Sequence, residues 1–269
     1  MEIRSQFFSN SYGVRKLTWG WLIVCSLIVC DGAVHANTLI LPPQIEKEVS
    51  NDQHKGNQQL LLPNLPLGPH KPYMSGIPTG FIDSGINAEH PQLKGLVVAE
   101  RDFTGEGIGD SQNHGTIVAL IYLKTQFDWA EQQKDLRKKW GTARIQSFSP
   151  LSPIYSAKVV GKRWVSNQEI VDRIIKAISW LSEMKVKTIS ISMALLNEQA
   201  DYTQLCDAIE KEKKVLFSIS AGNNGPDSIV YPAACKTENA IVVGAVSKDG
   251  IIPEYSGPSE IVAQDKVGK

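Results

Sequence analysis

The sequence lacks any excess or concentrated block of charge of one sign. Its 269 residues carry 28 basic and 28 acidic side chains, so the formal net charge is zero. Nucleic acids and anionic membrane surfaces attract proteins through concentrated positive charge. The densest basic cluster, at residues 134–139, fits the solvated face of a helix. We therefore expect no nucleic-acid partner.

Long hydrophobic runs are also missing. An uncharged and mostly apolar stretch near the N-terminus covers 12 residues, 19–30, which is too short to cross a bilayer comfortably. Basic residues precede it, and residues 34–36 offer a cleavage site before Asn37. Residues 1–36 are therefore predicted to be a secretory signal peptide. The mature chain is expected to be secreted or periplasmic, with no membrane segment after cleavage.

Two alternatives for this segment stay open. It could be a retained membrane anchor, or it could mark a lipoprotein attached through Cys30. Val29 is bulkier than the small residue that usually precedes a lipidated cysteine, which favours the signal peptide.

Cysteine is scarce. Four are present, and only Cys206 and Cys235 lie beyond residue 36. Because an exported chain meets oxidising conditions, a disulfide between these two is predicted, with two buried free thiols as the alternative. It would tie the helix before one strand to the loop after that strand. Neither cysteine has metal-ligand neighbours, so no zinc or other metal site is predicted.

Proline and periodicity divide the rest of the chain. Residues 37–75 are rich in proline and predict an extended N-terminal arm. Residues 76–269 alternate strand and helix patterns, which is typical of parallel βαβ units in an α/β sandwich. One strand is predicted to end at Asp83. Further strands are predicted to cover residues 96–99, 154–160, 188–193, 215–219 and 241–246. Helices are predicted to start at His114 and to cover residues 126–140, 167–184 and 203–213.

Three polar motifs follow or precede these elements. Asp83-Ser84-Gly85 ends an apolar strand, His114-Gly115-Thr116 opens a helix, and Ala221-Gly222-Asn223 follows another strand. Taken alone, each fits an ordinary turn or cap. Chemistry in open α/β sheets lies outside the carboxyl ends of strands, so the three together predict one site at that edge.

These motifs, in this order, resemble the subtilisin-like serine peptidases. The resemblance implies a three-layer α/β sandwich with a mostly parallel sheet. It implies that Asp83 orients the imidazole of His114, that His114 is the general base, and that Asn223 donates to the oxyanion. Ser192, Ala194 and Gly222 match the positions that bind an extended substrate backbone. The implied enzyme is a monomeric serine endopeptidase that acts on proteins or peptides.

The sequence departs from the family at its nucleophile. The family places this serine in Gly-Thr-Ser-Met-Ala, and no such stretch occurs before Lys269. We therefore expect residues 76–269 to be a partial peptidase domain, incomplete at its C-terminus and inactive as written. The alternative is a pseudoprotease that binds extended peptides without cutting them.

Two further departures concern metal binding and the substrate wall. Gln92 stands where the family often has a calcium-binding aspartate, and losing a carboxylate ligand disfavours a hard cation. No cofactor is predicted: calcium stays possible, with no site assigned. Ala194 replaces a glycine in the substrate-binding segment and is expected to crowd the pocket wall.

Overall fold

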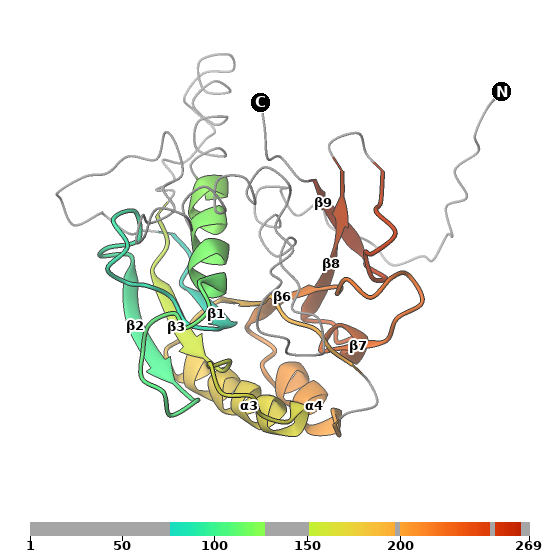
Figure 1. Cartoon of the computed structure of the whole chain (residues 1–269), viewed down its shortest axis with the longest axis horizontal. Coiled ribbons are helices and arrows are strands. Elements are labelled where there is room, and N and C mark those ends of the chain that lie inside the picture. The colour runs from blue at the N-terminus through green and yellow to red at the C-terminus, as the bar shows by residue number, and fades with distance from the viewer. Residues whose placement is uncertain (1–75, 127–150, 197–199, 248–250, 265–269) are drawn as a thin grey trace, which may run out of the picture.

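A seven-stranded parallel sheet forms the centre of the molecule (Figure 1). The computed structural model describes residues 76–126, 151–196, 200–247 and 251–264. The strand order is β2-β3-β1-β4-β6-β8-β9, and every neighbouring pair is parallel. The strands are β1 (Thr79–Asp83), β2 (Val97–Asp102), β3 (Ile154–Lys158), β4 (Thr188–Ile191), β6 (Leu216–Ser220), β8 (Ala240–Val246) and β9 (Ile261–Gln264).

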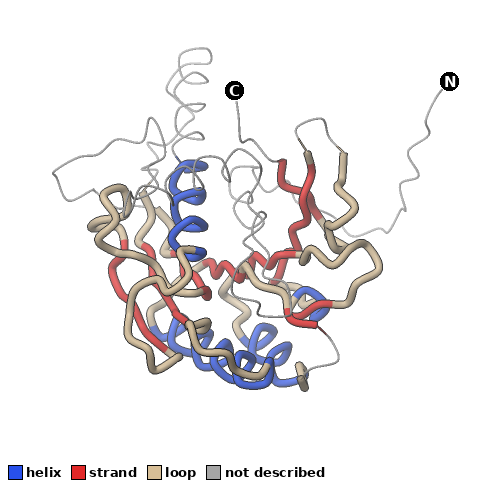
Figure 2. The backbone as a smooth tube through the Cα atoms, viewed as in Figure 1, coloured by secondary structure: helices blue, strands red, loops and turns tan. Residues whose placement is uncertain are grey.

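Helices cover both faces of this sheet. The helix that begins at residue 114, described to residue 126, lies on one face; α3 (Asn167–Glu183) and α4 (Thr203–Lys211) lie on the other (Figure 1, Figure 2). Successive strand residues point to opposite faces. Phe81 accordingly joins the cluster beneath the first helix, and Ile82 joins the cluster beneath α3 and α4. The predicted α/β sandwich with a mostly parallel sheet is confirmed.

The apolar stripe of α3 explains how this helix packs. Ile170, Ile174, Ile178 and Leu181 recur at helical spacing and are all buried, so one face meets the sheet. Ser166 caps its start by accepting a hydrogen bond from the backbone N–H of Glu169. The observed bounds lie within one residue of those predicted.

Three short strands were not predicted. β5 (Leu195–Leu196) pairs antiparallel with β7 (Val230–Tyr231), and β9 adds an edge strand beside β8. Two-residue strands show no alternation, so their sequence gives no periodic signal. The arm at 37–75, the predicted 126–140 helix beyond residue 126, and residues 1–36 lie outside the described residues. Across the residues the structure does describe, none of the helices combines the length and apolar character that bilayer crossing demands.

A disulfide joins α4 to the segment after β7. Cys206 lies in α4, and Cys235 ends the short 3-10 helix η3 (Ala233–Cys235). Their sulfur atoms are 2.07 Å apart, and the bond closes a separation of 29 residues. The bond therefore attaches the end of the segment that runs from β6 through β7 to α4.

Candidate active site

The register of three neighbouring strands aligns the predicted residues at one edge of the sheet. Ile82 on β1 pairs with Ile191 on β4, which pairs with Ile219 on β6. The next residue on each strand is therefore at the same level: Asp83, Ser192 and Ser220, respectively. Because these strands are parallel, all three residues lie at the carboxyl edge, where ligands of such sheets bind.

Asp83 and His114 are in direct contact at this edge. Asp83 Oδ1 lies 2.6 Å from His114 Nδ1 across a separation of 31 residues. The two residues are 3% and 2% exposed. The same carboxylate oxygen accepts the backbone N–H of Ser84 at 2.7 Å. The aspartate is thus oriented by its own turn and has the geometry to hold an imidazole in one tautomer.

Glycines make this contact possible. Gly85 has a φ of 100°, a conformation that L side chains rarely adopt. Its carbonyl oxygen occupies the space that a Cβ on Gly115 would need. The turn after β1 and the first turn of the helix can therefore approach closely enough for their polar side chains to meet.

Carboxylates hold the loop between β2 and His114. Asp102 accepts hydrogen bonds from the amide and hydroxyl of Thr104 and from the amide of Gly107. Burial opposes ionisation of Asp102, but these hydrogen bonds and the nearby Lys158 outweigh it and lower its pKa. Asp102 therefore stays charged and fixes the start of the loop.

Glu106 ties this loop to the one after β3. Its two oxygens accept the backbone N–H groups of Lys162 and Arg163 at 2.7 and 2.9 Å. These two hydrogen bonds lower the pKa of the Glu106 carboxyl. Buried Lys158 adds a bond from its Nζ to the carbonyl of Gly107 at 3.0 Å.

The predicted oxyanion and substrate residues follow β4 and β6. Asn223 is half-buried, two residues beyond buried Ala221. Gly222 has a φ of 83°, and a Cβ there would lie 3.3 Å from the Cβ of Ala194 and 2.9 Å from Val230 Cγ2. Ala194 and Gly222 thus face each other beside Val230. Val230 was not predicted, because nothing in the motif points to it.

The remaining predicted position, Ser192, is buried behind this edge. Its hydroxyl lies 3.4 Å from that of Ser190. The neighbouring Met193 carbonyl accepts a hydrogen bond from Ser220 at 3.2 Å. This second bond fastens the end of β6 to the segment that follows β4.

Two serines close to the predicted motifs have engaged hydroxyls. Ser84 Oγ donates to Asp110 Oδ1 at 2.7 Å and accepts the N–H of Gly115 at 3.1 Å. Ser256 Oγ accepts the N–H of Ala245 on β8 at 3.0 Å. Both hydroxyls are therefore already hydrogen-bonded to neighbouring groups of the protein.

The described residues contain no cluster of side chains that could bind a metal ion. No group of three or more His, Cys, Asp or Glu side chains gathers there. His90 and Gln92 are buried, and His90 Nδ1 accepts the N–H of Gln92 at 3.3 Å. This bond stabilises the turn that residues 90–92 form.

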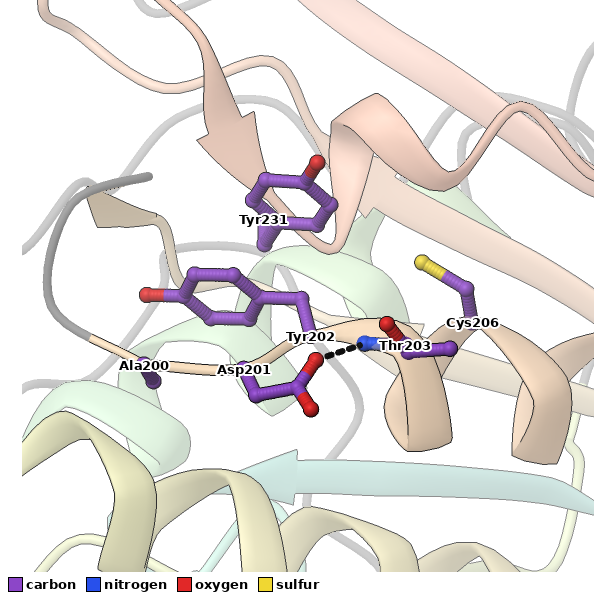
Figure 3. Close-up of a pocket in the computed structure, with 6 residues that line it drawn as sticks. All are labelled: Ala200, Asp201, Tyr202, Thr203, Cys206 and Tyr231. Carbon is purple, nitrogen blue, oxygen red and sulfur yellow. Dashed lines mark hydrogen bonds between the residues drawn. The ribbon is translucent and has the colours of Figure 1, made fainter.

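A hollow of about 300 Å³ lies at the start of α4 (Figure 3). The rings of Tyr202 and Tyr231 stack beside it, with centroids 4.1 Å apart and planes 1° from parallel. Asp201 accepts the N–H of Thr203 at 3.0 Å, and Cys206 of the disulfide completes the lining. None of the residues with a predicted catalytic or substrate-binding role lines this hollow.

Comparison with known proteins gives consistent matches. The family model described as Peptidase S8, Subtilase family, matches residues 75–266. An intracellular serine protease of Paenibacillus polymyxa is 28% identical over 200 residues, which cover 70% of this chain and 55% of that protein. The major intracellular serine protease of Bacillus subtilis (strain 168) is 27% identical over 197 residues, with coverages of 68% and 55%.

A solved structure also matches, and the relatives are longer than this chain. The patellamide maturation protease PatA superposes with a TM-score of 0.48 at 19% identity, covering 68% of this chain and 61% of that one. The chain spans about half the length of the two curated serine proteases, 55% of each. Because the family model matches well over half of its residues, the chain belongs to the subtilase family.

Proposed function

We propose that this chain carries the acid, the base and the oxyanion donor of a serine endopeptidase that hydrolyses peptide bonds. The contact that supports this most is the buried 2.6 Å pair between Asp83 Oδ1 and His114 Nδ1. A carboxylate at Nδ1 leaves Nε2 as the nitrogen that accepts a proton from a serine hydroxyl. It also stabilises the imidazolium that then forms.

Asn223 supplies the oxyanion donor in this proposal. Asn223 follows β6, whose carboxyl end lies at the same edge of the sheet as Asp83. An amide fixed there would donate to the negative oxygen of the tetrahedral intermediate. Ser192, Ala194 and Gly222 would bind the backbone of an extended substrate by main-chain hydrogen bonds. A side chain at position 222 would collide with Val230, so this position of the proposed substrate-binding segment requires glycine.

The attacking serine is the missing part of this machinery. The 269 residues contain no Gly-Thr-Ser-Met-Ala stretch, and the hydroxyls of Ser84 and Ser256 are committed to other bonds. The proposed enzyme therefore takes its nucleophile from sequence outside these residues, and the 269-residue chain alone is expected to be inactive. Translating the coding DNA downstream in all three frames tests this directly. A stretch resembling Gly-Thr-Ser within roughly a hundred codons is expected; its absence removes the main support.

A non-catalytic peptide-binding protein is the second candidate. The absent serine and the crowded wall at Ala194 favour it. A serine-reactive fluorophosphonate probe applied to the native protein separates the two candidates. Labelling that is lost on His114→Ala supports the endopeptidase and excludes the binding protein. If the native protein binds an extended peptide but is not labelled by the probe, the second candidate is supported.

We also propose that the protein is exported. Residues 1–36 have the composition of a signal peptide, and a Cys206–Cys235 disulfide suits an oxidising compartment. The two relatives described above are named as intracellular, so the location needs its own test. Mass spectrometry of the native protein should find an N-terminus at Asn37, outside the cytoplasm. An intact Met1 on a cytoplasmic protein with free thiols would contradict export.

A further inference from the structure

We infer that Asp110 is a positioning residue that fastens the turn after β1 to the start of the 114–126 helix, so that Asp83 meets His114. The consequence of this role for catalysis rests on the proposed function, whereas the effect of Asp110 on the contact between Asp83 and His114 does not. Asp110 lies in the glycine-rich segment between β2 and the helix, four residues before His114. Its carboxylate contacts both elements that carry the pair.

Both oxygens of Asp110 are fully used as acceptors. Oδ1 accepts hydrogen bonds from Ser84 Oγ at 2.7 Å and from the N–H of Gln112 at 3.0 Å. Oδ2 accepts from the N–H of Thr116 at 2.8 Å and from its hydroxyl at 2.6 Å. A carboxylate provides acceptor sites for all four donors, and hydrogen bonds to a charged acceptor are the stronger kind.

These four bonds reach residues on both sides of the pair. Ser84 directly follows Asp83, and Thr116 lies two residues after His114. The network closes through two more bonds: Ser84 Oγ accepts the N–H of Gly115 at 3.1 Å, and Thr116 Oγ1 accepts the N–H of Asn87 at 3.0 Å. The turn after β1 and the first helical turn are therefore joined through one carboxylate, and the hydrogen bonds of Asp110 to Ser84, Gln112 and Thr116 form this joint.

The charge of Asp110 also suits its place. The first turn of a helix has unpaired N–H groups and a partial positive charge, which an anionic side chain stabilises. An asparagine at this position could keep one acceptor oxygen but would present an N–H₂ group to two of the donors. Asp110→Asn should therefore weaken the joint, and Asp110→Ala should remove it.

Asp102 provides the matched control. Its carboxylate belongs to the same loop region and accepts three hydrogen bonds, but all of them come from Thr104 and Gly107. It contacts neither Ser84 nor Thr116 in those bonds. If the joint at Asp110 matters only for general loop stability, Asp102→Asn should have the same effect on His114 as Asp110→Asn.

The test follows the proton between His114 Nδ1 and Asp83 by NMR in the full 269-residue chain. Its resonance is assigned by its disappearance in Asp83→Asn. In Asp110→Ala the signal should be lost, or its exchange with solvent should be faster by about tenfold or more, as expected when a charged hydrogen-bond partner is removed. Asp110→Asn should lie between this variant and the wild type, and Asp102→Asn should retain the wild-type signal.

Ser84→Ala keeps the inference testable if Asp110→Ala does not fold, because it removes one of the four bonds to Asp110, together with the bond from Gly115, and leaves the other three bonds to Asp110 in place. Faster exchange in Ser84→Ala supports the joint. A wild-type exchange rate in folded Asp110→Asn and Ser84→Ala, or an equal loss in Asp102→Asn, overturns it. A form of the protein that carries the nucleophilic serine separates this inference from the proposed function. If that form lacks peptidase activity but exchange of the His114 proton still changes in the Asp110 variants, the proposed function is wrong and this inference stands.

Discussion

The carbonyl oxygen of Gly85 occupies the place where Gly115 would carry a side chain. The backbone of the β1 turn thus touches the backbone of the first helical turn. A Cβ at Gly115 would also come within 3.1 Å of the Asp83 Cβ. This relationship sets how closely the carboxylate of Asp83 and the ring of His114 can approach.

Gly115→Ala should therefore push the two turns apart. Overpacking a rigid backbone contact is expected to cost about 3 kcal/mol of unfolding free energy and to weaken the Asp83–His114 contact. Gly105→Ala is the control, because its φ of 78° is unfavourable for alanine but its Cβ would meet open space. That change should cost about 1–2 kcal/mol and leave the His114 proton signal intact. Equal effects of both variants in urea unfolding and NMR would contradict the close approach.

Removing the disulfide should destabilise the segment between β6 and η3. The bond closes a loop with a sequence separation of 29, for which the chain-entropy model gives about 3–4 kcal/mol. Cys206→Ser with Cys235→Ser should lower the free energy of unfolding by this amount. Dithiothreitol should destabilise the wild type and leave the double variant unchanged. Equal stability of the wild type with and without reductant would show that the bond is not formed in solution.

Glu106 should control the loop after β3. In Glu106→Gln, one of the two amides that the carboxylate holds, Lys162 or Arg163, loses its acceptor. Hydrogen exchange of these amides should accelerate by about tenfold. Because these bonds lower the pKa of Glu106, the stabilisation is present above the unfolded-state pKa and is lost as the pH falls through the folded-state value. Protection of these two amides that does not change with Glu106→Gln or with acid would contradict this account.

Glu100 on β2 should respond to pH in the opposite direction. Burial raises its pKa, a hydrogen bond from the backbone of Gly109 partly offsets this, and nearby Glu89 adds to the increase. In the described part of the chain, its Oε1 is buried without a hydrogen-bond partner. The folded state therefore binds the Glu100 proton more tightly than the unfolded state does.

Stability from Glu100 should thus be present below the unfolded-state pKa and be lost as the pH rises through the folded-state pKa. Glu100→Gln removes this titration, so the variant should gain stability relative to the wild type as the pH rises from 4 to 7. Urea unfolding across this range measures the difference, with exposed Glu238→Gln as the control. A difference that stays constant with pH would contradict the burial of an ionising Glu100.

Long periodic elements and paired motifs could be predicted from the sequence. The isoleucines of α3 recur at helical spacing, and the apolar residues before Asp83 mark a buried strand, so both elements lie where they were expected. The family's motif order implied that Asp83 and His114 would converge, and the structure places them in contact. Their catalytic roles stay proposals.

Contacts made by irregular backbone could not be predicted in this way. Asp110 sits among glycines with no periodic pattern, and its role depends on where Ser84 and Thr116 meet in space. The one local signal was a common turn pattern, in which an aspartate side chain accepts a hydrogen bond from the backbone N–H two residues later, here from Asp110 to Gln112. β5 and β7 depend on each other across the chain and are too short to be visible in either segment alone.

Casein hydrolysis by two forms of the protein tests the central claim most directly: the 269-residue chain, and the protein extended to include the serine stretch that we propose is encoded downstream. Each is measured with and without His114→Ala. We predict that only the extended protein cleaves casein, and that His114→Ala reduces its rate by several orders of magnitude. Cleavage by the 269-residue chain that depends on His114, or cleavage by the extended protein that does not, would contradict the account.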